Sequence, residues 1–247
     1  NASDTSGAVT FSIAFTDTAG NAGTAVTSGS GSVTFDKTAP AITGVSLNAA
    51  NSELTVTFAE SVYDTDAGSG DLEAADFTLS IVGGTATVSA TPASIAKTSQ
   101  TEWVLTLTTS GTANGSEVIT VVPAGATSIY DTAGNAASTT QSNNTATFND
   151  KTAPTLSSVG IASDNTTTTL AKVGDVVTLT FTASETIATP VVTFQSGGAA
   201  ITDTSITYAN TGNVHTAKYT ANTSDTAGSV TYSIAFSDSA GNAGVAV

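Results

Sequence analysis

The sequence of 247 residues contains no cysteine, no methionine and no arginine, and five lysines stand against 20 acidic residues. Without cysteine, neither a disulfide framework nor a thiolate metal site can form. A formal net charge of −15 excludes a basic surface that neutralises phosphates and disfavours attraction to anionic membranes. No apolar run approaches the roughly 18 residues that a membrane-spanning helix needs. The composition therefore predicts a protein with no nucleic-acid partner and no membrane insertion, stabilised by core packing or bound ions.

Residues typical of catalysis are also scarce. His215 is the only histidine, so no site with several histidine ligands can form. Because it follows Val214 in a predicted strand, we expect it at the surface. No Gly-x-Ser-x-Gly nucleophile motif occurs, and the acidic residues fall in predicted turns. Trp103, the only tryptophan, stands among alternating apolar residues and is predicted to lie in the core. The sequence therefore predicts that the protein is not an enzyme.

The sequence repeats itself, which is informative about domain organisation. Residues 222–247 match residues 1–26 at 19 of 26 positions, with an offset of 221. The motif Asp-Lys-Thr-Ala-Pro begins at Asp36 and again at Asp150, an offset of 114. The period of 221 thus divides into modules of 114 and 107 residues, each the size of one β-sandwich domain of roughly 100 residues. We predict the end of one module at 1–35, a complete second type at 36–149, and the first type again at 150–247, without its last strand.

Alternation of apolar residues with threonine is the main secondary-structure signal. It predicts strands over 9–15, 54–58, 103–107, 118–122, 176–181 and 230–236, separated by glycine-rich turns. One helical turn is expected at 72–77, with Asp71 as its N-cap. About seven strands per module predict an all-β fold of tandem immunoglobulin-like Greek-key β-sandwiches. Pro40 and Pro154 stiffen the short junctions, so we expect the modules to form an end-to-end rod.

Several of these motifs together resemble a known family. The module start Asp-Lys-Thr-Ala-Pro precedes a strand that ends near Glu60 or Glu185, and Asp-x-Ala-Gly-Asn precedes the last strand. This combination resembles the bacterial Ig-like tandem repeats of giant secreted surface adhesins. The module 36–149 is similar to repeats of the cyanobacterial swimming-protein type. The resemblance implies an extracellular, cell-surface protein whose repeats serve as stalks or spacers.

Acidic residues recur at the module junctions, where they could bind a cation. In a seven-stranded sandwich, the start of the first strand, the loop after the second and the loop before the last lie at one end. These places hold ten candidate ligands, namely Asp36, Glu60, Asp64, Asp66, Asp131 and Asn135 in one module, and Asp150, Glu185, Asp238 and Asn242 in the next. Calcium prefers six to eight oxygen ligands of this kind. The sequence therefore predicts calcium sites at the junctions, arranged as in cadherin-type proteins by analogy only.

A simpler interpretation of the same residues stays open. Asp-x-Ala-Gly-Asn is also a turn sequence, in which the aspartate accepts backbone hydrogen bonds and glycine takes a positive φ. The segment beginning Asp64-Thr-Asp66 is similar to the start of an EF-hand loop, but Ser69 and Ala75 stand where that loop needs glycine and glutamate. A turn and an ion site can coexist at the same residues.

The leading functional prediction is a structural extender segment of a long extracellular bacterial adhesin or surface filament. Calcium at the module junctions is expected to make it rigid. Its expected partners are the neighbouring Ig-like modules of its own chain and other copies in a filament. One alternative is a module that binds a glycan or a protein through its loops. A second alternative is a filament subunit joined by donor-strand complementation, in which one copy supplies the last strand of another.

Overall fold

The computed structural model describes residues 3–247, which divide into two compact units. The first unit contains residues 3–111 and 115–148, and the second contains residues 112–114 and 149–247. Residues 1 and 2, the first positions of the predicted segment 1–35, lie outside the described residues. The rest of that segment groups with the first unit. The division next to Asn149 lies beside the sequence-predicted boundary between 149 and 150.

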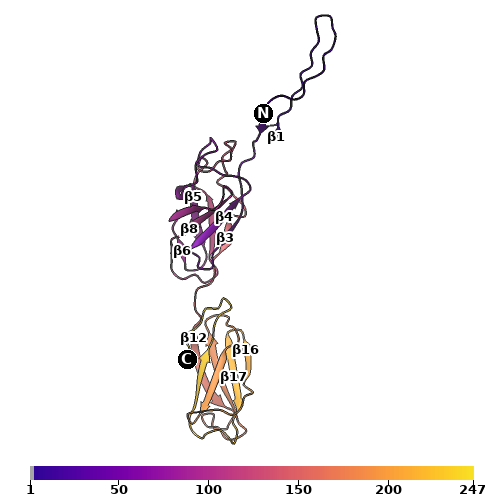
Figure 1. Ribbon diagram of the computed structural model, residues 1–247. Helices are drawn as coiled ribbons and strands as arrows, with labels where there is room; N and C mark the ends of the chain where they lie inside the picture. Colours follow the sequence, from indigo (N-terminus) through magenta and orange to yellow (C-terminus); the bar gives the residue numbers. More distant parts are fainter. Residues whose placement is uncertain (1–2) are drawn as a thin grey trace. The chain divides into compact units, whose positions relative to one another are not determined.

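The first unit is built from antiparallel sheets (Figure 1). One sheet has the order β3-β4-β8-β7 and a second has the order β11-β10-β5. Short pairs β1-β2 and β6-β9 complete it. The strands are β1 (Gly7–Ala8), β2 (Thr34–Phe35), β3 (Ile42–Leu47), β4 (Glu53–Phe58), β5 (Phe77–Val82), β6 (Thr87–Val88), β7 (Ser94–Lys97), β8 (Glu102–Thr106), β9 (Thr109–Ser110), β10 (Val118–Pro123) and β11 (Thr145–Thr147).

The second unit also has one four-stranded and one three-stranded sheet, but the smaller sheet is arranged differently. Its four-stranded sheet has the order β12-β13-β17-β16, and its three-stranded sheet has the order β15-β14-β18. The strands are β12 (Leu156–Ser163), β13 (Val176–Ala183), β14 (Val191–Ser196), β15 (Ala199–Ala200), β16 (Thr207–Thr211), β17 (Val214–Thr220) and β18 (Val230–Ala235). In the first unit β10 lies between β11 and β5, whereas β18 has a sheet neighbour only in β14 among the described strands. Strand β18 is therefore an edge strand.

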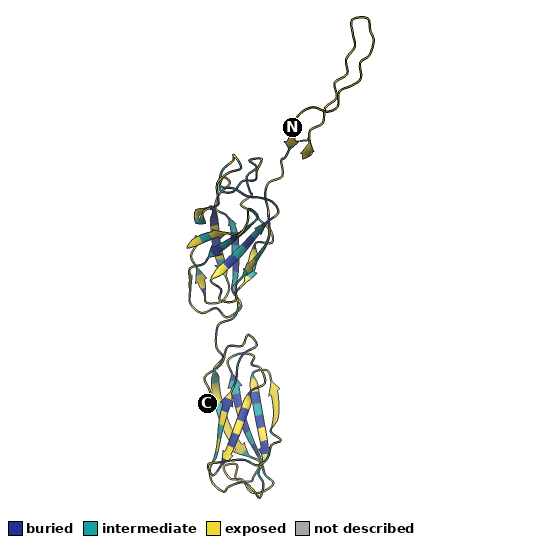
Figure 2. Ribbon diagram, viewed as in Figure 1, coloured by how far each residue is buried: buried dark blue, intermediate teal, exposed yellow. Residues whose placement is uncertain are grey.

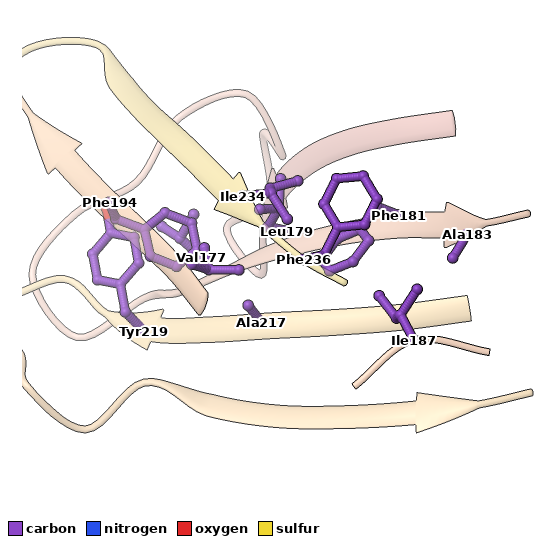
Figure 3. Close-up of a cluster of buried hydrophobic side chains, with 11 residues drawn as sticks. Val177, Leu179, Phe181, Ala183, Ile187, Phe194, Ala217, Tyr219, Ile234 and Phe236 are labelled. Atoms are coloured by element: carbon purple, nitrogen blue, oxygen red, sulfur yellow. The ribbon is translucent and has the colours of Figure 1, made fainter. Parts of the chain in front are cut away.

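The core of each unit lies between its two sheets, as the period-2 pattern requires. Figure 2 shows buried and exposed residues alternating along the strands. In the second unit, buried side chains from both sheets meet, and Phe194 and Tyr219 have ring centroids 4.8 Å apart (Figure 3). In the first unit Trp103 is 1% exposed, so the prediction that it belongs to the core is confirmed. The all-β sandwich-type fold predicted from the sequence is the fold of both units.

Three local predictions need correction. Residues 9–15 form no continuous strand, although isolated pairing at Ile13 with Val26 is present. The helical turn exists as a 3₁₀ turn, Ala74–Asp76, but its N-cap is Glu73, and Asp76 closes a capping box with it. His215 is buried at 7% exposure, not a surface residue, because Phe181 stacks on its ring at 5.5 Å.

No described helix of this chain is long and apolar enough to cross a membrane, since the only described helix is the three-residue 3₁₀ turn.

Candidate metal centres

Three acids from distant parts of the first unit come together at one end. Asp36 follows β2, Glu60 follows β4, and Asp131 lies in the loop after β10. One carboxylate oxygen of each lies within 4.8 Å of the other two. Asp131 is fully buried, and the other two side chains are half-buried. The sequence-predicted convergence of these three loops is therefore seen within the first unit.

The second unit contains the same arrangement. Asp150 stands two residues after Phe148, Glu185 follows β13, and Asp238 follows β18. Their carboxylate oxygens also lie within 4.8 Å of one another, and Asp238 is the buried member. Equivalent positions of two modules with different sequences thus hold the same three acids. Because the cluster recurs at equivalent positions, chance in an acidic chain does not explain it.

A tight turn fixes the buried aspartate of each cluster. Asp131 Oδ1 accepts hydrogen bonds from the backbone N–H groups of Ala133 and Asn135, both at 2.8 Å. Asn135 Nδ2 donates to Asp131 Oδ2 at 2.7 Å and to the Asp36 carbonyl oxygen at 3.4 Å. Through Asn135, the turn of Asp131 is thus hydrogen-bonded to the backbone of Asp36, where the chain enters the sandwich.

The second unit repeats the network with the same geometry. Asn242 donates from its backbone N–H to Asp238 Oδ1 at 2.8 Å and from Nδ2 to Asp238 Oδ2 at 2.7 Å. Its Nδ2 also donates to the Asp150 carbonyl oxygen at 3.2 Å. In the described structure, Asn135 and Asn242 therefore act as donors that orient an aspartate. Both the turn and the acid cluster predicted from these residues are present.

The two glutamates differ from the aspartates in their hydrogen bonding. Neither Glu60 nor Glu185 has a carboxylate hydrogen bond to any described residue. Burial raises the pKa of Glu60, and the negative charges of Asp131 and Asp36 raise it further. Burial likewise raises the pKa of Glu185, with smaller contributions from Asp150 and Asp238. Each glutamate thus brings uncompensated negative charge to its cluster.

The pKa of Asp238 shifts in the opposite direction. Burial alone would raise it, but hydrogen bonds from the side chain and backbone of Asn242 and from the turn outweigh burial and lower the pKa. Hydrogen bonds to the ionised form stabilise that form. Asp238 therefore stays ionised beside Glu185, and the cluster keeps its negative charge near neutral pH.

Two of the predicted acidic ligands lie outside the clusters. Asp64 is half-buried and lies close enough to Asp76 for its charge to contribute, after burial, to the raised pKa of that residue. Asp66 is exposed, and its carbonyl oxygen lies so close to Gly134 that a Cβ there would come within 2.5 Å. The loop that carries Asp64 and Asp66 therefore packs by its backbone against the turn of Asp131.

Comparisons with protein-family models, with curated proteins and with solved structures gave no match to this chain.

Proposed function

We propose that this chain is a structural extender segment of a long extracellular adhesin or surface filament, built from tandem immunoglobulin-like modules that bind Ca²⁺ at their chain-entry ends. The observation that carries the proposal is the recurrence of one three-acid cluster, Asp36, Glu60 and Asp131 in one unit and its equivalents in the other. A spacer needs the same device in every module, whereas a recognition module needs loops that vary. The near identity of residues 1–26 and 222–247 also favours a spacer.

Calcium suits the clusters because its preferred ligands are oxygen atoms of carboxylates, carbonyls and water. Each cluster offers three carboxylates, and both oxygens of Glu60 lack a hydrogen bond to any described residue. Three negative charges within 4.8 Å repel one another, and a divalent cation removes this repulsion. Water would complete a coordination shell of six to eight oxygens.

The location of the clusters suggests what calcium would do. Asp36 and Asp150 begin the Asp-Lys-Thr-Ala-Pro motifs, through which the chain passes from one module to the next. An ion that joins such an aspartate to Glu60 or Glu185 fixes this segment against the body of its module. In this proposal calcium makes the junctions stiff, which extends the filament.

The test compares the protein in calcium and in chelator, by calorimetry and by small-angle X-ray scattering. Calcium binding to the folded state at 100 times Kd stabilises it by about 2.7 kcal/mol, so both unfolding transitions should rise. The scattering should report a narrower distribution of sizes in calcium, and magnesium should act more weakly because it requires stricter geometry. Unchanged melting and scattering in calcium would exclude the ion-dependent extender.

A further inference from the structure

The second unit contains a small cavity at the edge of its four-stranded sheet. It lies where β16 and β17 meet the loop 184–190, which connects β13 to β14. Its volume is about 160 Å³, the space of roughly five water molecules at ~30 Å³ each. All its lining residues lie between Ile187 and Thr216, away from both ends of the sequence. The cavity is smaller than the roughly 300–1,000 Å³ of pockets for drug-sized ligands, but it leaves room for one small ring.

His215 lines this cavity and has an unsatisfied ring nitrogen. Its side chain is 7% exposed, and its ring stacks on Phe181 with 12° between the ring planes. The Nε2 atom is buried and has no hydrogen-bond partner among the described residues. Buried polar atoms of folded proteins nearly always have a partner, in the protein or in ordered solvent. A group inside the cavity is therefore the candidate partner of Nε2.

The strand register makes His215 the counterpart of Trp103 in the first unit. Both four-stranded sheets begin with a bulge, and the two bulges are separated by the same offset as the two Asp-Lys-Thr-Ala-Pro motifs. Counted from the bulge, Phe181 takes the place of Val56, and their partners on the neighbouring strand are His215 and Trp103. Trp103 is 1% exposed, so a buried indole fills this position in the first unit.

Smaller side chains leave space open at this end of the second core. Ala183 stands where the first unit has Phe58, because each pairs with the residue before the bulge. Phe58 and Trp103 are both buried, and the residues in their places, Ala183 and His215, are smaller. Phe181, at the same end of the core as Ala183 (Figure 3), returns only part of this volume. The cavity is therefore created by the second unit's own sequence.

Uncharged polar groups surround the cavity. Asn210 pairs with His215 across the strands, so the two side chains lie on the same inward face. Thr189 also lines the cavity, and neither its Oγ1 nor the Oδ1 of Asn210 accepts a hydrogen bond from a described residue. Tyr208 lies on the same face, and its hydroxyl accepts the backbone N–H of Val192 at 3.1 Å. Because Val192 belongs to β14, this hydrogen bond connects the two sheets and fixes the tyrosine ring at the cavity wall.

From this geometry we infer that the cavity binds a single neutral sugar ring, either free or at the end of a glycan. His215, Asn210 and Thr189 can exchange hydrogen bonds with the hydroxyl groups of a sugar, which both donate and accept. Pro190 and the ring of Tyr208 line the cavity as well and offer apolar contact to the C–H groups of the sugar. A few polar groups within apolar walls are typical of a small-molecule site.

The charge of the cavity disfavours ions. None of its lining residues is an acid or a lysine, and burial lowers the pKa of His215, so the imidazole is neutral near neutral pH. A cation would find no carboxylate among these residues. An anion would be repelled by Glu185, which stands in the loop 184–190, and by the net charge of −15. An uncharged ligand rich in hydroxyl groups fits these conditions.

The test uses the signal of a single residue. Because His215 is the only histidine, the proton NMR signal of its Cε1–H reports this cavity alone. The methyl glycosides of glucose, galactose, mannose and N-acetylglucosamine are added in chelator, up to tens of millimolar. At least one should shift the signal in a saturable way, with a millimolar dissociation constant. If none does, the cavity holds ordered water only and the inference is wrong.

Two further ligands define the chemical class. The methyl glycoside of glucuronic acid carries a negative charge and should bind at least about tenfold more weakly than the best neutral glycoside. Equal binding of this anion would overturn the assignment to neutral sugars. The free sugar is compared with its methyl glycoside, because the methyl group stands for the rest of a glycan. Equal binding assigns the end of a glycan, and binding of the free sugar alone assigns a free monosaccharide.

Variants locate the binding in the cavity. His215→Trp introduces the indole of the first unit at its equivalent position and should abolish binding, which saturation-transfer NMR of the glycoside measures. The second calorimetric transition shows whether this variant is folded. Asn210→Ala, at an exposed position, removes one hydrogen-bonding group and should weaken binding about fivefold. Thr211→Ala is the matched control, because Thr211 pairs with the exposed Val214 on the other face, and it should bind as the original chain does.

The variants also decide against the inference if the cavity is not the site. Full binding by Asn210→Ala, or by folded His215→Trp, would overturn it. If His215→Trp does not fold, Asn210→Ala and its control decide alone. All measurements are made in chelator, so a failed ion site leaves this inference standing, and a cavity that binds no sugar leaves the calcium proposal standing.

Discussion

Replacing one glutamate of a cluster should have opposite effects on the free energy of unfolding in chelator and in calcium. The change is Glu60→Gln, which keeps the shape of the side chain and removes its charge. In chelator the variant should be more stable than the original chain, because Glu60 faces two negative charges and accepts no hydrogen bond from a described residue. In calcium it should be less stable, because one of three charged ligands is lost.

The magnitude follows from the separation of the carboxylates. Two like charges within 4.8 Å of each other repel by about 1 kcal/mol in bulk water and about 3.5 kcal/mol at an effective dielectric constant of ~20. The half-buried, salt-screened position of Glu60 favours the lower figure. Two such pairs give about 2 kcal/mol, or roughly 8 °C in the melting temperature of a domain of this size. Calcium at 100 times Kd stabilises only the original chain, by about 2.7 kcal/mol.

The assay uses the single tryptophan. Trp103 lies in the core of the first unit, so the thermal transition in tryptophan fluorescence reports that unit alone. We expect Glu60→Gln to melt higher than the original chain in chelator and lower in excess calcium. The original chain and the variant are measured at the same low ionic strength, since salt weakens the repulsion.

The equivalent change in the other unit is the matched control. Glu185→Gln should leave the tryptophan transition unchanged and should shift only the second calorimetric transition. If Glu60→Gln melts lower than the original chain in chelator, the glutamate is a structural residue and the charge argument is wrong. If calcium stabilises Glu60→Gln as much as the original chain, the cluster is not the binding site.

Three further predictions concern pH and buried polar groups. In chelator, the free energy of unfolding should rise as the pH falls through the raised pKa values of Glu60 and Glu185, because protonation relieves repulsion that the unfolded chain lacks. A calorimetric pH series measures this rise, and calcium should suppress it. Burial lowers the pKa of His215, so the second unit should lose stability below about pH 6.5, where the histidine of the unfolded chain becomes protonated. The variant His215→Phe should remove that loss in the same pH series. Glu117 is fully buried and accepts the backbone N–H of Thr85 at 2.8 Å, so Glu117→Ala should destabilise the first unit by about 2 kcal/mol or more in urea denaturation.

Much of the fold could be predicted because its strands follow the simple period-2 rule. Strands β4, β10 and β13 contain the segments 54–58, 118–122 and 176–181 that alternation selects. The rule fails at residues 9–15, where an identical pattern has no facing sheet to bury its apolar side chains. Ile13 is 54% exposed, while its equivalent Ile234 is fully buried. Alternation measures the potential for a sandwich strand, and tertiary packing decides whether a strand forms.

The candidate site could be predicted in part for a different reason. Topology alone brings the loops of Asp36, Glu60 and Asp131 to one end of a sandwich, so the sequence was sufficient for these three acids. The exclusion of Asp66 could not be predicted, because it depends on the close backbone approach between its loop and Gly134.

The three copies of the Asp-x-Ala-Gly-Asn turn separate the turn from the ion site. In the N-terminal segment Asp17 accepts the backbone N–H and the Nδ2–H of Asn21, both at 2.8 Å, as the equivalents Asp131 and Asp238 do with their own asparagines. Asp17 belongs to neither acid cluster, so the turn forms its hydrogen bonds without acidic neighbours. The turn is thus a local property of five residues, while Glu60 and Glu185 come from a distant loop and contribute nothing to it. The turn needs its aspartate and asparagine but neither glutamate. For Glu60 and Glu185, only charge and ion binding supply a reason.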